Sequence, residues 1–214
     1  MSDIFEEVEE DLRRDRTLAL WKKYGPYAVG AGLAIVAIAA GIAWYVEYRN
    51  TLAERAAAQF VAAADLAAGP NKPRALSAFA TIIRDAPTGY ATVARFYEGA
   101  IKGQTADHAA AVAEYRALAA DSSVLRELRD AATLLAAVHL AITAGVAEIE
   151  REVAPIAGAD NPWRHVAREL IGVVALKSGD LSKARQMFTV IADDPGAPQS
   201  LRGRAAELLA ALGA

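Results

Sequence analysis

The sequence predicts an all-α protein, with one N-terminal transmembrane helix followed by an α-solenoid of paired helices and a C-terminal capping helix. Three observations predict this class. A run of 23 residues, 24–46, carries no charged side chain. The rest of the chain follows a helical period, without the sustained period-two alternation that is typical of strands. A small–small–large spacing recurs along residues 47–214, as expected of stacked helical repeats.

Residues 1–23 are predicted to form a short leader helix. Asp3 and Glu6 have the spacing of a capping box, and a thin apolar stripe follows at Ile4, Val8 and Leu12. Two interpretations stay open for this segment. A solvated leader whose basic end sets the topology is favoured over a helix that docks on a cytoplasmic or membrane partner.

Residues 24–46, YGPYAVGAGLAIVAIAAGIAWYV, are long enough to cross a bilayer, since a helix rises about 1.5 Å per residue and the hydrocarbon layer is roughly 30 Å thick. Aromatic residues mark both ends of the run, where they favour the headgroup region. The acidic leader and the long core favour an uncleaved signal anchor over a cleaved signal peptide. Two small-residue pairs, Ala28/Gly32 and Ala37/Gly41, have the spacing of close helix contacts, although alanine is common throughout this chain.

The basic residues that flank the anchor predict its orientation. The N-terminal side carries more of them than the C-terminal side: Arg13, Arg14, Arg16, Lys22 and Lys23 against Arg49 and Arg55. The positive-inside rule therefore places the N-terminus in the cytoplasm. In the inner membrane of a bacterium with an outer membrane, this single-pass topology makes residues 47–214 periplasmic.

Residues 47–214 are predicted to form one helical-repeat domain. A small residue is followed after twelve positions by an alanine and after a further four by an aromatic residue. This spacing occurs three times, at Ala63/Ala75/Phe79, Gly99/Ala111/Tyr115 and Gly172/Ala184/Phe188. Such positions let the two helices of a tetratricopeptide-like unit interlock.

Two further segments complete the predicted solenoid. A helix over residues 125–142 and a shorter one over 146–156 are interpreted as a degenerate unit. The apolar stripe expected on the longer helix consists of Leu125, Leu128, Ala132, Leu135, Val138 and Ile142. Residues 198–212 are predicted to form the helix that covers the last apolar face of the stack, because an uncovered end would expose it.

The sequence offers little chemistry for catalysis. It contains no cysteine, which excludes thiol chemistry, and its net charge of −3 gives no electrostatic reason to bind nucleic acid. His108, His139 and His165 are far apart in sequence, and Asp193–Asp194 is interpreted as a helix-ending turn. The arginines at 164, 168, 202 and 204 are interpreted as solvated helix faces rather than a basic patch. We therefore expect no enzymatic activity, cofactor, metal or small-molecule substrate.

The remaining candidate site is a groove lined by the first helices of the repeats, the usual recognition face of such solenoids. Its predicted residues are Val93, Phe96, Val173 and Leu176. For each of these residues the alternative, that it belongs to the core, stays open.

The sequence also resembles the YfgM-like family of tetratricopeptide-like inner-membrane proteins. The resemblance covers nearly the whole chain and is carried by three stretches: residues 161–164 (NPWR), 176–180 (LKSGD) and 198–209 (PQSLRGRAAELL). It implies an ancillary subunit of the SecYEG translocon, whose partners are translocon subunits, a membrane-anchored periplasmic folding factor and newly exported chains. It implies no catalytic residues.

A second function stays open at this point. The same solenoid would also serve as an assembly factor for another envelope complex, in cytochrome maturation or respiratory-chain assembly. An unrecognised hydrolase would instead need a polar pocket with a strongly perturbed carboxylate or histidine.

Overall fold

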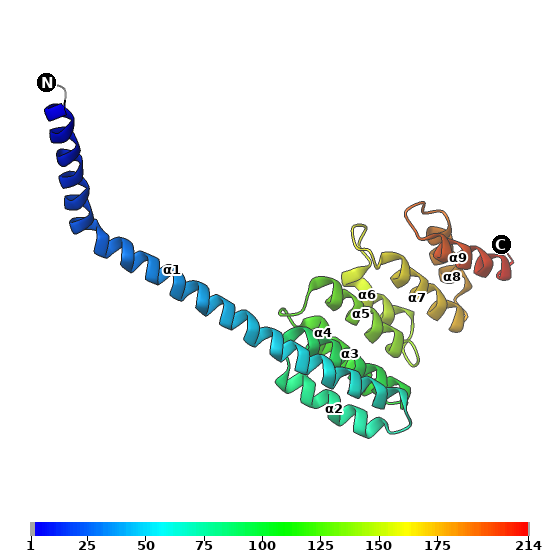
Figure 1. The fold of residues 1–214 in the computed structure, drawn as a ribbon. Coiled ribbons are helices and arrows are strands. Elements are labelled where there is room, and N and C mark those ends of the chain that lie inside the picture. The colour runs from blue at the N-terminus through cyan, green and yellow to red at the C-terminus, as the bar shows by residue number, and fades with distance from the viewer. Residues whose placement is uncertain (1–2, 214) are drawn as a thin grey trace. The chain divides into compact units, whose positions relative to one another are not determined.

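The structure, a computed structural model, describes the backbone of residues 3–213 and the side chains of residues 18, 20–27 and 29–213. Within this range the secondary structure is helical and contains no strand, which confirms the predicted all-α class (Figure 1). The helices are α1 (Asp3–Ala68), α2 (Lys72–Asp85), α3 (Thr88–Gln104), α4 (His108–Ala120), α5 (Arg126–Leu140), α6 (Val146–Val153), the short 3-10 helix η1 (Ala154–Ile156), α7 (Arg164–Lys177), α8 (Leu181–Ala192) and α9 (Gln199–Ala211).

Helix α1 runs without interruption through the predicted leader and anchor and into the repeat domain. The chain divides into two compact units, Met1–Glu54 and Arg55–Ala214. Two predictions for the leader lie outside the described side chains. They are the capping box of Asp3 and Glu6 and the apolar stripe of Ile4, Val8 and Leu12. The same holds for Arg13, Arg14 and Arg16.

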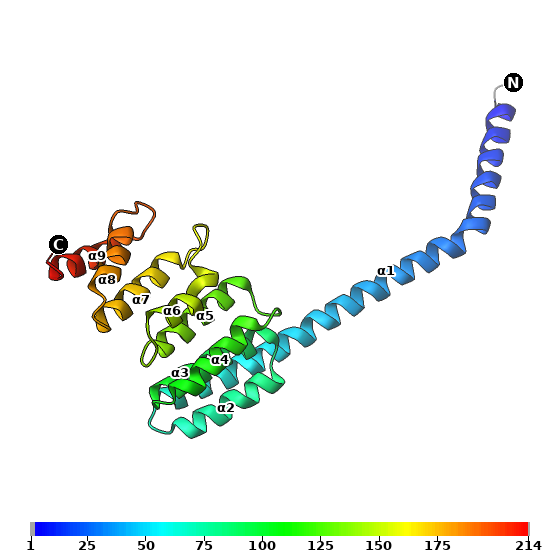
Figure 2. The ribbon, with the colours of Figure 1, turned by 180° about the vertical axis from the view of Figure 1, so that it is seen from behind.

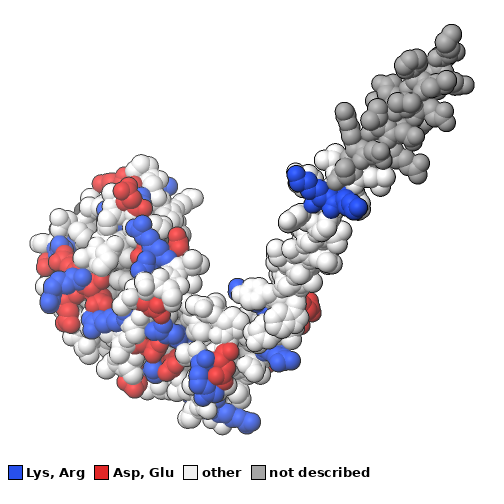
Figure 3. Space-filling model, turned by 90° about the vertical axis from the view of Figure 1, so that its left-hand side faces the viewer, with Lys and Arg blue, Asp and Glu red and all other residues white. Residues whose placement is uncertain are grey.

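The first unit carries the apolar run. One helix segment, Leu20–Ala68, is long and apolar enough to cross a membrane, with a mean hydropathy of 2.1 in its most apolar window and none of that window buried. Leu33, Ile35 and Ile38 are all more than half exposed, as expected of side chains that need an apolar solvent. In the space-filling view the described part of this run is almost entirely uncharged (Figure 3).

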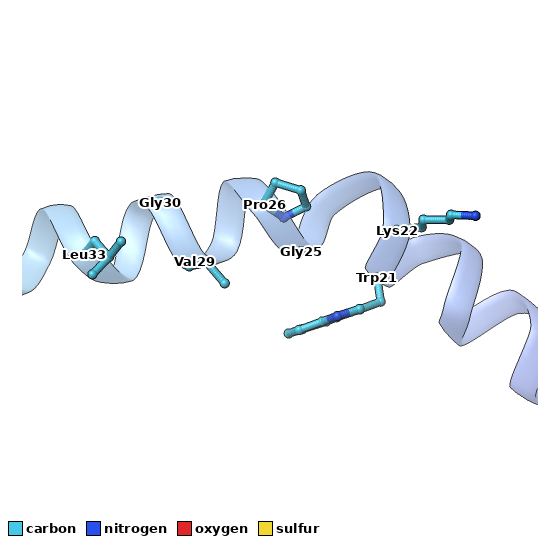
Figure 4. A pocket seen from close by; sticks show the side chains of 7 residues that line it. All are labelled: Trp21, Lys22, Gly25, Pro26, Val29, Gly30 and Leu33. Atoms are coloured by element: carbon cyan, nitrogen blue, oxygen red, sulfur yellow. The ribbon is translucent and has the colours of Figure 1, made fainter.

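Pro26 lies inside α1, and the helix bends beside it (Figure 4). Proline has no N–H to donate and its ring crowds the carbonyl one turn earlier, so a bend is expected here. The indole of Trp21 covers Gly25, where an added Cβ would lie 3.3 Å from the ring. A shallow hollow with mainly apolar walls follows on this side of the helix, extending to Leu33.

In the second unit the helices follow one another in space in their order along the chain (Figures 1 and 2). Each of the helices α2 to α8 packs on the next. Their apolar faces meet in four clusters of buried side chains arranged along the stack. The core is thus a series of inter-helix layers, as expected of a solenoid in which each repeat contacts only its neighbours.

Three of the helices begin at a side chain that caps them. Asn71, Asp107 and Asp180 each accept a hydrogen bond from the backbone N–H three residues later, at 3.3, 3.1 and 3.0 Å. These bonds satisfy amide groups that the first helical turn leaves free. The sequence therefore fixes the starts of α2, α4 and α8 locally.

Helix α9 confirms the predicted C-terminal cap. Leu201 and Ala205 are buried against Ala184, Phe188 and Ile191 of α8. Leu208, Leu209 and Leu212 pack at the edge of the same cluster. The helix therefore covers the last apolar face of the stack.

Candidate protein-binding face

The recurring spacing corresponds to close helix contacts in the structure. An added Cβ at Gly99 would lie 2.7 Å from Cζ of Tyr115, and one at Gly172 would lie 2.7 Å from Cε1 of Phe188. Both aromatic rings are buried, at 1% and 0% exposure. The glycine of the first helix thus makes room for the aromatic ring of the second, and the pair sets the distance between the two helices.

Two further helix pairs form repeats of the same kind. They have other residues in place of the glycine, the alanine or the aromatic residue. In the first helical repeat of the solenoid, Ala63, Ala75 and Phe79 are all fully buried. In the unit that the sequence showed as degenerate, Ala137, Ile149 and Val153 have the same offsets of twelve and four, and all three are fully buried. The spacing is therefore present in four helical repeats. In the third repeat, isoleucine takes the place of the alanine and valine that of the aromatic residue.

The predicted stripe of α5 is partly wrong. Its buried face is formed by Ala132, Leu134, Ala136 and Ala137. Leu125, Val138 and Ile142 from the predicted stripe are instead 69%, 43% and 46% exposed. Leu128 and Leu135 of the predicted stripe do pack against the cluster that contains Ala132. Alanines take most of the fully buried positions, where α5 packs closely on α4.

Similar ion pairs occur in the second and the last helical repeats of the solenoid. Arg95 donates to Glu114 at 3.0 Å and to Asp121 at 3.1 Å. The equivalent arginine of the last unit, Arg168, lies 3.8 Å from Asp194. Both aspartates follow their arginine by 26 residues, so the sequence itself carries a signal for this pair. The pairs join the first helix of a unit to the end of its second helix.

The four residues predicted to line the groove lie in two different environments. Val93 on α3 and Val173 on α7 are 41% and 43% exposed. Phe96 is half-buried, with its ring centre 6.0 Å from that of Tyr115, and Leu176 is half-buried at the edge of the last cluster. The two valines are thus open to a partner, whereas Phe96 and Leu176 also pack against the core.

Further exposed apolar residues on the first helices were not predicted as site residues. Tyr97 follows Val93 by one turn of α3, Val138 lies on α5, and Ile142 lies in the turn just after α5. Nζ of Lys177, one turn after Val173, donates to the carbonyl oxygen of Ile142 at 2.9 Å. This bond brings the ends of α5 and α7 together, so their exposed apolar side chains belong to neighbouring surfaces. We call Val93, Tyr97, Val138, Ile142 and Val173 the first-helix face.

The arginines near the C-terminal end are mostly paired or anchored. Arg204 makes a two-point contact with Glu169, at 2.8 and 3.0 Å, and Arg164 donates to the carbonyl oxygen of Asn161 at 3.3 Å. Acidic and basic groups are interspersed over the repeat domain in the view of Figure 3. Arg168 and Arg204 thus face partners of opposite charge, whereas Nε of Arg202 is buried without a hydrogen-bond partner among the described residues.

Two of the three histidines lie far apart in sequence but close together in the structure. His108 and His139, 31 residues apart, have their Nδ1 atoms 3.3 Å apart. His165 is 2% exposed and neither of its ring nitrogens has a hydrogen-bond partner. Burial first, and then the charge of Arg164, lower the pKa of His165 below its ordinary value of 6.5, which keeps the ring neutral. Among the described residues no group of three or more histidine or acidic side chains could hold a metal ion.

Comparison with curated proteins and with solved structures gives no match for this chain. Comparison with protein families matches residues 19–203 to the family described as tetratricopeptide repeat-like domain. Repeats of this kind generally form non-catalytic scaffolds that bind other proteins. Because the match spans most of the 214 residues and agrees with the stacked helix pairs, the chain belongs to the tetratricopeptide repeat-like domain family.

Proposed function

We propose that this protein is a membrane-anchored scaffold that binds other proteins through the first-helix face of its repeat domain. The observation that carries the proposal is the set of exposed apolar side chains on α3, α5 and α7 of a chain whose α1 is apolar enough to span a bilayer. Water-exposed valine, isoleucine and tyrosine on neighbouring helices are typical of a surface that a partner covers. Phe96 and Leu176 complete the proposed face at its edge with the core.

We further propose the boundaries of the functional parts. Residues 1–23 are the cytoplasmic leader, residues 24–46 the anchor and residues 47–214 the repeat domain. Lys22 and Lys23, both exposed, precede the apolar run and support a cytoplasmic N-terminus. In a bacterial inner membrane the repeat domain is then periplasmic, where its lack of cysteine makes it independent of disulfide formation.

The partner class that fits this arrangement best is the protein-export machinery. The resemblance to YfgM-like proteins supports a role as an ancillary subunit of the SecYEG translocon that passes exported chains to a membrane-anchored periplasmic folding factor. A role in the assembly of another envelope complex, such as a cytochrome or a respiratory-chain enzyme, uses the same scaffold. The two roles differ only in the proteins that they bring together.

Purification in a mild detergent followed by mass spectrometry distinguishes them. The translocon role predicts that translocon subunits are enriched with the full chain, whereas enrichment of haem-ligation or oxidase components would contradict it. Two variants show whether the first-helix face carries the binding. Val173→Asp should lose the partners. The matched change Val190→Asp, on the second helix α8 and with a similar exposure of 40%, should keep them.

Equal recovery of partners with Val173→Asp and Val190→Asp would contradict the proposed face while leaving the partner class intact. Both side chains lie on the surface of helices, so neither aspartate disturbs the core. A circular dichroism melt of each variant confirms that the repeat domain remains folded.

A further inference from the structure

The histidine pair formed by His108 and His139 joins the second unit of the solenoid to the third. His108 is the first residue of α4 and His139 lies in the last turn of α5. Their ring planes differ by 26° and their ring centres are 5.5 Å apart, whereas the Nδ1 atoms are only 3.3 Å apart. The nitrogen-bearing edges therefore face each other. In this geometry one Nδ1–H donates to the lone pair of the other Nδ1.

Neighbouring residues fix the ring of His139 in this position. An added Cβ at Gly103 of α3 would overlap the ring, so glycine is required there. The ring of Tyr115 lies parallel to it, at 10° and 5.8 Å between ring centres. The imidazole of His139 on α5 is thus in contact with both α3 and α4.

Among the described residues, no carboxylate lines the cavity beside the pair. This cavity, of about 300 Å³, has Arg116 and Thr143 as its other polar side chains. Arg116 is bound to Glu152 of α6 at 2.7 Å, and the α4 N-cap Asp107 accepts from the amide of Ala110.

On the side of α3, Nζ of Lys102 binds Glu98 at 2.7 Å and lies 3.5 Å from Glu114. These acidic groups are thus engaged with other cations or with a backbone amide, and the charge of Glu148 on α6 acts on Arg116. The charge that acts on His139 is that of His108, so among the described residues the pair faces no directly opposed negative charge.

We propose that His108 and His139 form a pH-sensitive latch between α4 and α5, closed while at least one of the two imidazoles is neutral and open when both are protonated. Two imidazolium rings have no lone pair to accept the hydrogen bond, and their like charges repel at this distance. Burial and the charge of His108 lower the pKa of His139 from its ordinary value of 6.5. The closed latch therefore resists protonation of His139, and acid favours the opened state, in which that resistance is removed.

The latch lies beside part of the first-helix face. Val138 and Ile142 flank His139 in sequence, and Val93 and Tyr97 belong to the preceding unit. Opening the contact between α4 and α5 therefore changes the position of Val93 and Tyr97 relative to Val138 and Ile142. The titration itself does not depend on the proposed function, since it follows from the geometry of the two imidazoles alone.

Hydrogen exchange of the full chain in detergent micelles, followed by mass spectrometry at pH 7.5 and pH 5.0, tests the latch. After correction for the intrinsic exchange rates, peptides from the start of α4 and the end of α5 should exchange about tenfold faster at pH 5.0. Peptides of α2, which contains no histidine, should be unaffected.

Three variants make the test specific. His108→Asn keeps a hydrogen-bonding partner for His139 but cannot be protonated, and should abolish the acid-induced opening. His108→Lys places a permanent positive charge there and should open the joint already at pH 7.5. His165→Gln, in α7, should leave the response of α4 and α5 unchanged. An equal response of the parent and His108→Asn, or slow exchange of the parent and of His108→Lys at both pH values, would overturn the proposal.

Discussion

At the scale of single residues, the distance between paired helices depends on a few glycines, which have no Cβ atom. Gly172 and Gly99 each lie under an aromatic ring that would collide with a Cβ atom. Gly203 in α9 has no heavy atom within 4 Å of such a Cβ. The three glycines thus have the same helical backbone but different surroundings, which allows the packing contribution to be measured separately from helix propensity.

Gly172→Ala should destabilise the repeat domain. Alanine improves helix propensity by about 1 kcal/mol, but a Cβ 2.7 Å from Phe188 overpacks the core, which typically costs 1–3 kcal/mol. Chemical denaturation should therefore show a lower free energy of unfolding. The control Gly203→Ala should instead stabilise the domain by up to about 1 kcal/mol, because only the propensity changes. If both variants were stabilised, the glycine would not be a packing residue.

Acid should destabilise the domain through His165. Its lowered pKa means that the folded state holds the neutral ring, so the unfolded chain takes up a proton first as the pH falls below 6.5. Stability is then complete above that value and is lost below it, by at most about 1.4 kcal/mol per pH unit. Thermal melts at pH 7.5 and 5.5 should show a lower midpoint at pH 5.5, and His165→Gln should reduce the difference. A variant with the full pH dependence of the parent would show that His165 is not responsible.

At the scale of elements, most helices follow from local signals in the sequence. Side chains at 71, 107 and 180 cap three helices, and the small–small–aromatic spacing identifies three of the four interlocked units. The third unit escaped this pattern because Ile149 and Val153 replace the small and aromatic residues. The exposed positions of α5 could not be predicted either, since close packing of alanines reversed the expected burial of the larger side chains.

Helix α9 should stabilise the whole stack as its C-terminal cap. Changing Leu208 and Leu209 together to aspartate places two charges at the edge of an apolar cluster and removes part of the burial of two leucines, at roughly 1.5–3 kcal/mol for each fully buried side chain. The midpoint of thermal unfolding should fall. The double change Ala206→Asp and Ala210→Asp, on the exposed side of the same helix, adds the same charge and should have little effect. Equal midpoints for the two double variants would contradict the capping role.

At the scale of the whole molecule, the chain combines an apolar helix with a domain of stacked helical repeats. The long apolar helix and the solenoid class could both be predicted, because length, hydropathy and repeat spacing are properties of the sequence itself. The pair of His108 and His139 could not, because residues 31 apart meet only through the packing of α4 on α5. The same is true of the exposed first-helix face, which depends on which side of each helix its neighbours cover.

The anchor should depend on the apolar character of its centre. Ile38→Arg adds roughly 2.5–3.5 kcal/mol to the free energy of insertion, which nearly cancels the roughly 2–4 kcal/mol that the aliphatic residues contribute. The protein should therefore be recovered from the soluble fraction or fail to insert. Val61→Arg lies on the same helix beyond the apolar run, with a similar exposure of 60% against 63%, and should remain in the membrane. Resistance of the Ile38→Arg variant to carbonate extraction would contradict the anchor.

Site-specific photo-cross-linking in living cells tests the central claim most directly. A photoreactive amino acid is placed at Val93, Val138 or Val173 on the first-helix face, and at Val190 or Leu181 on α8 as controls of similar exposure. Protein adducts are expected from the first three positions, and few or none from the two controls. Adducts formed equally from α8, or absent from all three positions of the first-helix face, would contradict that claim.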